Sequence, residues 1–417
     1  MKWLRRNLVR IVVFAASALL ALAVTPESWP WEWTGALLPR LSPILGLLGP
    51  AAARAWIGWT MLLAVPLLVL AFFKGRFFCW HICPMGFAAE TAGRLNPWGK
   101  SAIKRIPTLN KAIALVIAAS AACGYPLFIW LDPLCIFNGF FAAFREPFAW
   151  TAAGTGAAFM AVIALGVAAP NVWCHRLCPL GGLQEWVMLL ARRLRDRKAP
   201  QNAPATNALT SASTTRRTIL TAVASAAAGA AARKVFGPNG RKVLRPPGAD
   251  LERINALCAR CGNCMRACTY QLIQPDLGES GIDGLFTPVV HLRSRNLDQE
   301  QYCFQDCTAC TRVCPTGALR TLTVEEKHAR PIGIAEIDLK KCLAWEKKEY
   351  CAVCDEYCPY KAVKLEKHGE VMCPVVDPGL CRGCGACESA CPADPIAIIV
   401  KPEATSRTIR RTQSPTT

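Results

Sequence analysis

Sixteen of the 23 cysteines in this 417-residue chain form four closely spaced groups in its second half. Three close cysteines bind three irons of one cubane, and a fourth, usually followed by proline, starts a helix and reaches the neighbouring cluster. Proline follows the last cysteine in all groups but the first, where Thr269 stands. The pattern predicts four 4Fe-4S clusters. The groups are Cys258, Cys261, Cys264 and Cys268; Cys303, Cys307, Cys310 and Cys314; Cys342, Cys351, Cys354 and Cys358; and Cys381, Cys384, Cys387 and Cys391.

Exchange of the fourth cysteine between paired groups gives a ligand set for each cluster. Cys303 and Cys342 stand further from their partners than is usual, and Cys373 is left over. The predicted sets are Cys258, Cys261, Cys264 and Cys314 for cluster I; Cys303, Cys307, Cys310 and Cys268 for cluster II; Cys342, Cys351, Cys354 and Cys391 for cluster III; and Cys381, Cys384, Cys387 and Cys358 for cluster IV.

Two other uses of so many cysteines fit the pattern less well. A disulfide scaffold would explain the number of cysteines but not the fourfold repeat, and zinc prefers two-plus-two ligand knuckles. No acid–base constellation accompanies the clusters, and His291, His328 and His368 are scattered. The chain is therefore expected to be an electron carrier without catalytic residues, and whether it also oxidises a quinol stays open.

The first half repeats a second cysteine motif, C-x3-C-P-x-G, at Cys79 and Cys83 and again at Cys174 and Cys178. Spacing of four residues puts two thiols on one face of a helical turn. The two pairs would converge on a metal centre or form redox disulfides, and the plainer alternative is a pair of structural turns. In the same half, His81 and His175 are equally consistent with ligands and with interfacial side chains, and Cys123 and Cys135 with buried packing.

Four apolar segments of the first half approach the 20 or so residues that a bilayer crossing needs. Lys and Arg are concentrated at the N-terminus, after the second segment and after the fourth, which places both ends in the cytoplasm. We expect residues 1–190 to form a four-helix bundle in a bacterial inner membrane. The segments are Leu8–Val24, Ala55–Phe73, Ala112–Leu131 and Trp150–Ala169.

Residues 191–216 combine a basic flank with a flexible polar linker. Arg216 and Arg217 precede an alanine-rich run, so residues 217–232 are expected to be a twin-arginine-like signal or a short fifth helix. Residues 250–400 would then form a periplasmic α+β domain of bacterial-ferredoxin type with two pseudo-twofold cluster pairs, before a disordered tail at 401–417. The net charge of +19 lies beside apolar runs, which argues against nucleic-acid binding.

The motifs resemble two known families. The first half, with CWHICPMG, LDPLCIFNGF and CHRLCPLGG, resembles NapH-type membrane ferredoxins and the membrane core of NosR. The second half, with RRTIL, CARCGNCMRAC, CTACTRVCP, CLAWEKKEYCAVCDEYCP and CRGCGACESACP, resembles the exported ferredoxins of the NapG/MauM type. The chain joins both types, and no flavin-binding domain of the kind NosR-like proteins carry is seen in it.

This resemblance implies an electron route from the quinol pool to a periplasmic redox enzyme such as a reductase. A factor that donates electrons during the maturation of a periplasmic metalloenzyme is the main alternative, and a redox sensor is a third. In every case the inner membrane is the expected location.

Overall fold

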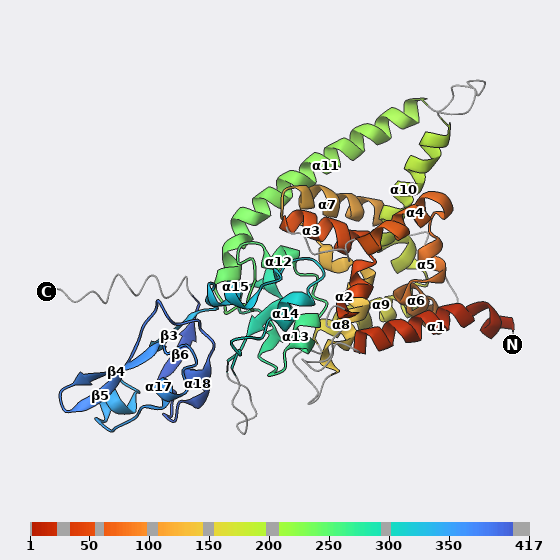
Figure 1. The fold of residues 1–417 in the computed structure, drawn as a ribbon. Helices are drawn as coiled ribbons and strands as arrows, with labels where there is room; N and C mark the ends of the chain where they lie inside the picture. Colours follow the sequence, from red (N-terminus) through yellow and green to blue (C-terminus); the bar gives the residue numbers. More distant parts are fainter. Residues whose placement is uncertain are drawn as a thin grey trace.

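The computed structural model describes residues 2–22, 34–54, 62–97, 107–144, 154–196, 208–292 and 302–402. A helical unit (residues 2–196), a long helix α11 (Ala208–Phe236) and a cysteine domain (residues 237–402) follow one another (Figure 1). The helical unit contains α1 (Lys2–Leu22), α2 (Thr34–Arg40), α3 (Gly49–Ala53), α4 (Ala64–Lys74), α5 (Phe77–His81), α6 (Pro84–Gly93), α7 (Asn110–Ala122), α8 (Pro133–Phe140), α9 (Ala157–Ala168) and α10 (Pro179–Asp196), with short turns η1 (Ile44–Leu48), η4 (Ile129–Leu131), η5 (Phe141–Ala143) and η7 (Trp173–Leu177).

The internal repeat of the sequence is also a repeat of structure. In each copy the second motif cysteine precedes a proline that starts a helix, α6 in the first copy and α10 in the second. Proline suits a helix start because its missing N–H would be unpaired there in any case. The copies are interleaved, since α6 packs against α9 and α10 packs against α4.

The predicted membrane segments are only partly helical in the described residues. Each contains an apolar helical stretch, but these stretches have fewer than 18 residues, and residues 23–24, 55–61 and 150–153 of the segments lie outside the description. In the third segment α7 ends at Ala122 because Gly124, at φ +76°, and Pro126 interrupt it. Among the described residues, four full-length crossings are therefore not supported.

Helix α11 is longer than the sequence pattern over residues 217–232 indicates. Its part Thr218–Phe236 is the one helix among the described residues that is long and apolar enough to cross a membrane. It packs along α7 through small residues: Ser225 and Gly229 are buried, whereas Val223 is 64% exposed.

The cysteine domain consists of short helices and two-stranded antiparallel sheets. Strand β1 pairs with β2, β3 pairs with β6 and β4 pairs with β5. Because the strands are short, the buried cysteines themselves form much of the core between them. The elements are η8 (Gly237–Arg241), α12 (Ile254–Leu257), α13 (Asn263–Ala267), β1 (Ile273–Pro275), η9 (Ile282–Gly284), β2 (Pro288–Val290), α14 (Ala309–Arg312), α15 (Val324–His328), β3 (Ile334–Ile337), α16 (Leu343–Glu346), α17 (Val353–Glu356), β4 (Val363–His368), β5 (Val371–Val376), α18 (Ala386–Ala390) and β6 (Ile398–Lys401).

Candidate metal centres

Three of the four predicted ligand sets each line one cavity of the cysteine domain. Each set joins three cysteines of one group to the last cysteine of its partner group, as the exchange pattern predicts. One cavity is lined by Cys258, Cys261, Cys264 and Cys314, a second by Cys268, Cys303, Cys307 and Cys310, and a third by Cys342, Cys351, Cys354 and Cys391. We call these cages I, II and III. The irregular residues Cys303 and Cys342 lie with their sets.

The fourth set also gathers, around Cys387. Burial raises the pKa of this thiol, and the nearby charges of Cys384, Cys381, Cys354 and Cys358 raise it further. Burial, and then the charges of Cys358 and Cys381, raise the pKa of Cys384 in the same way. The four cysteines of the fourth set therefore gather as cage IV, with Cys354 of cage III beside them. All the cysteines of the chain are free thiols in the structure, so a disulfide scaffold does not account for the pattern.

The cages suit iron–sulfur clusters. Burial raises the pKa of Cys258 and of Cys384 to about 12, so these thiols would stay protonated until iron binds the sulfur and displaces the proton to solvent. Among the described residues, no three potential ligands lie close enough together to share a single metal ion. A cubane distributes its four thiolates over four separate irons, which a wider cage accommodates.

Backbone amides point at the sulfur atoms. The amide N–H groups of Leu319 and Ala335 donate to Cys314 Sγ and Cys381 Sγ, both at 3.4 Å. The amide of Ala362 donates to Cys358 Sγ at 3.2 Å. Such bonds stabilise thiolate charge and tune the potential of a bound cluster.

The cages lie in an order that differs from their order of first appearance in the sequence. Cages I and II are neighbours. Burial and the charges of the other cage I cysteines raise the pKa of Cys264, and the charge of Cys310 in cage II raises it further. Cages II and IV are joined by the amide of Cys303, which donates to the carbonyl of Cys384 at 2.9 Å. Cage IV adjoins cage III through Cys387 and Cys354. The order is therefore I, II, IV, III.

The two C-x3-C-P motifs of the helical unit converge as well. Burial raises the pKa of Cys178 well above its ordinary value, and the charges of Cys79, Cys174 and Cys83 add to the effect. These four cysteines form the inner thiol site. The imidazole of His81 instead lies 3.1 Å from the carbonyl of Phe77.

The motif glycines allow this convergence. A Cβ on Gly86 would lie 2.8 Å from the carbonyl oxygen of Cys79, and one on Gly181 would lie 3.2 Å from that of Cys174. At Gly86 a side chain would clash with the backbone of the preceding turn, and at Gly181 it would force the neighbouring backbone to shift. This explains the glycine in C-P-x-G.

Cage I rests directly on the helical unit, which the sequence did not reveal. Cys135 of α8 shares a hydrogen bond with Cys261, and this contact lowers the pKa of Cys261. Asn138 Nδ2 donates to the carbonyl of Cys261 at 2.9 Å, and Arg40 Nη2 donates to that of Cys314 at 3.0 Å. The segment LDPLCIFNGF contains Cys135 and could have indicated this contact. Its cysteine stands outside any ligand spacing, so the sequence alone indicates only buried packing.

Comparison with known proteins agrees with this chemistry. A profile described as a 4Fe-4S binding domain matches residues 56–105 and 151–198, which include both C-x3-C-P motifs. A profile described as a 4Fe-4S dicluster domain matches residues 257–318, and a further 4Fe-4S binding domain matches residues 374–397. No solved structure matches the chain.

Curated relatives cover part of the chain and most of their own length. The methylamine utilization ferredoxin-type protein MauM of Methylorubrum extorquens is 37% identical over 172 residues, which are 39% of this chain and 73% of that protein. The ferredoxin-type protein NapG of Escherichia coli is 34% identical over 171 residues, 38% of this chain and 70% of NapG. The chain thus carries iron–sulfur clusters for electron transfer, and it belongs to the family of ferredoxin-type proteins that includes MauM and NapG.

Proposed function

We propose that this protein relays electrons in the membrane, from the quinol pool through four 4Fe-4S clusters to a periplasmic redox enzyme, in the manner expected of a fused NapH-type and NapG/MauM-type protein. The observation that carries the proposal is the row of four thiol cages that begins against the helical unit, where Cys135 touches Cys261. When bound, the clusters supply one-electron carriers. A quinol that loses two electrons and two protons becomes a quinone, and the protons pass to water.

Outward-facing apolar side chains support a membrane location for the helical unit and α11. A soluble surface seldom exposes so many large apolar residues on neighbouring helices. They include Val9 (65% exposed) and Leu19 (67%) of α1, Phe73 (66%) of α4 and Met160 (55%) of α9. We therefore propose that the helical unit is embedded in the inner membrane.

The direction of α11 supports a periplasmic cysteine domain. This helix leaves the α10 end of the helical unit and reaches the cysteine domain at the opposite end (Figure 1). Because the charge distribution puts α10 on the cytoplasmic side, α11 would carry the chain across the inner membrane. Arg216 and Arg217 fit export of the folded domain by the twin-arginine route.

The inner thiol site is proposed to hold a metal centre of more than one metal ion, such as an iron–sulfur cluster, because no three of its cysteines lie close enough to share a single ion. Its four cysteines come from two copies of one motif, and both copies lie within the matched 4Fe-4S binding profile. Cys83 and Cys178 share one apolar core with Cys135 and Cys261 of the cage I contact. The inner site and cage I are thus linked by continuous packing.

Reduction of anaerobically purified protein in vesicles tests the relay. Addition of a quinol should reduce the clusters, as seen by EPR, and dithionite gives the full signal for comparison. If dithionite reduces the clusters and no quinol does, the relay is wrong.

Deletion of the gene separates the relay from a maturation factor. If the protein is a relay, its loss leaves the partner enzyme fully metallated but without its electron supply.

Protease treatment of spheroplasts tests the location. The cysteine domain should be digested from outside in intact spheroplasts, while the basic segment 191–196 should be protected. Protection of the cysteine domain until the membrane is broken would place it in the cytoplasm.

A further inference from the structure

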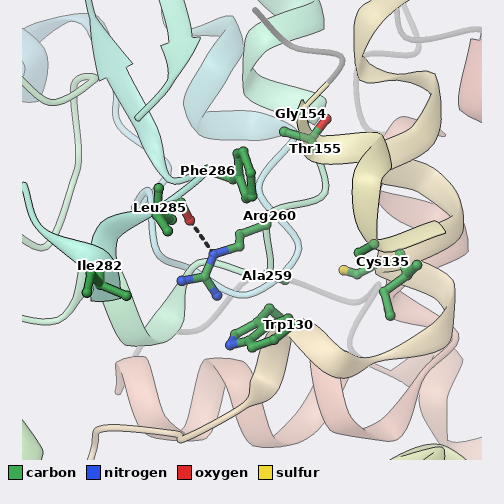
Figure 2. A pocket seen from close by; sticks show the side chains of 11 residues that line it. Trp130, Cys135, Gly154, Thr155, Ala259, Arg260, Ile282, Leu285 and Phe286 are labelled. Carbon is green, nitrogen blue, oxygen red and sulfur yellow. Dashed lines mark hydrogen bonds between the residues drawn. The ribbon is translucent and has the colours of Figure 1, made fainter. Parts of the chain in front are cut away.

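A cavity of about 270 Å³ lies between the helical unit and the cysteine domain (Figure 2). The turn η4 and helices α8 and α9 supply one wall, which includes Trp130, Cys135 and Ala158. The cysteine domain supplies the other wall, which includes Arg260, Ile282 and Phe286. The cavity exists only because the two parts of the chain meet there.

This cavity shares a wall with cage I. Ala259, Arg260 and Phe286 line both spaces. Ala259 and Arg260 lie between two cage I ligands in the sequence, Cys258 and Cys261. A molecule in the cavity would therefore be separated from cage I by a single layer of residues.

The lining is apolar except around one cation. The guanidinium of Arg260 lies over the ring of Trp130, 5.1 Å from its centroid. Its Nε donates to the carbonyl of Leu285 at 2.6 Å and its Nη2 to that of Asp283 at 2.8 Å. Its Nη1 is buried and has no hydrogen-bond partner in the described part of the chain. A buried donor without an acceptor is unfavourable, so a bound molecule with a carbonyl group would stabilise it.

We propose that this cavity binds the ring of a quinone or quinol, with a ring oxygen near Nη1 of Arg260 and the ring against Trp130 and Phe286. The inference rests on the proposed function and gives it a site. An apolar cavity of about 150 Å³ holds benzene, so this larger space accommodates a substituted six-membered ring. The apolar wall suits the ring faces, and the single cation suits its oxygen atoms.

Substitution of Ala158 tests the site without touching a cluster ligand. Ala158→Phe fills the cavity from α9, whereas Ala157→Phe places the same ring on the adjacent exposed position of that helix, outside the cavity. The probe is menadione, a quinone without a long tail, added to the full cluster-loaded chain in detergent and measured by equilibrium dialysis. Unchanged cluster absorbance in both variants shows that the protein is folded.

We expect Ala158→Phe to weaken menadione binding at least tenfold and Ala157→Phe to leave it unchanged. Equal binding by wild type and Ala158→Phe, or no saturable binding by wild type, would overturn the site. Displacement of menadione by a saturated fatty acid at equal concentration would also overturn it, because the cavity would then be an acyl-chain site. If quinols fail to reduce the clusters while menadione binds in an Ala158-dependent way, the relay fails and the site stands.

Discussion

At the scale of single residues, Cys135 joins the two halves of the chain. It comes from α8 of the helical unit and shares a hydrogen bond with Cys261, a predicted ligand of cluster I. Burial raises the pKa of Cys135. Because Cys261 would bind iron as a thiolate, the protonated thiol of Cys135 would be the donor. A donor to a ligand sulfur disperses the negative charge that a cluster gains on reduction.

Replacement of this thiol should change the potential of cluster I. We expect Cys135→Ala to make cluster I harder to reduce, with a more negative midpoint in an EPR-monitored redox titration. Cys123→Ala, the same change at the end of α7, should leave the midpoint where it is. An unchanged midpoint in Cys135→Ala would show that the hydrogen bond does not act on the cluster.

Asp132 is a buried carboxyl next to this contact. Ser42 Oγ and the amide of Leu134 donate to it, but burial outweighs both bonds and raises the pKa of Asp132 to about 7. In the unfolded chain the pKa of this carboxyl would be about 4. Between these values the folded protein holds a proton that the unfolded chain has lost. Stability from this group is therefore complete below about pH 4 and is lost as the pH rises towards about 7.

Asp132→Asn should remove this pH dependence, because the amide does not titrate and still caps α8. The measurement is the melting temperature in detergent at about pH 5.5 and about pH 7.5, on either side of the folded pKa. The melting temperature of the wild-type protein should fall more between these two pH values than that of the variant. Equal losses would mean that Asp132 is ionised throughout.

At the scale of elements, α11 is held by a close approach to α7. A Cβ on Gly229 would lie 2.9 Å from the Cβ of Ser120 and 3.3 Å from the carbonyl oxygen of Tyr125. Small residues let two helices pack backbone to backbone, and this contact matters most where lipid offers no hydrophobic drive between helices. The alanine-rich composition of α11 thus serves packing as well as length.

A large residue at this contact should separate the helices. We expect Gly229→Leu to lower the free energy of unfolding by about 1–3 kcal/mol, the usual range for overpacking. Ala230→Leu puts the same side chain on the neighbouring exposed position and should have little effect. Thermal unfolding of both variants in one detergent measures this difference. If Gly229→Leu is as stable as Ala230→Leu, the close contact between α11 and α7 does not contribute to stability.

At the scale of the whole molecule, the cages form a row that starts at the helical unit. Their order is I, II, IV, III, so cage IV, and not cage III, lies next to the first pair of cages. Cage III lies at the far end, beside the loop that carries Lys347, Lys348 and Tyr350, and Tyr350 is 75% exposed.

Variants that each lack one cluster test the order of the clusters. With quinol as the donor, Cys351→Ala should remove cluster III and leave the reduction of the other three intact. Cys307→Ala should remove cluster II and confine rapid reduction to cluster I. Freeze-quench EPR measures both, and dithionite should reduce every remaining cluster in each variant. Rapid reduction of cluster IV in Cys307→Ala would refute the row.

Local spacing in the sequence predicts four ligand sets, and the structure brings the cysteines of each predicted set together. A cubane takes ligands from one short loop and one distant cysteine, so C-x2-C-x2-C-x3-C records the chemistry directly, and each set found together in the structure had been predicted. The C-x3-C-P-x-G repeat likewise predicted two converging pairs. Helical content was predictable too, but Gly124 and Pro126 ended a segment that hydropathy alone treats as continuous.

The tertiary structure alone decided what lies between these local units. The contact of Cys135 with Cys261, the neighbouring positions of cages II and IV and the cavity beside Arg260 all join residues far apart in the chain. Such contacts depend on how whole elements dock, and docking leaves no periodicity or spacing in the sequence. Ligand chemistry is recorded over a few residues, whereas the path between clusters is set by packing over the whole chain.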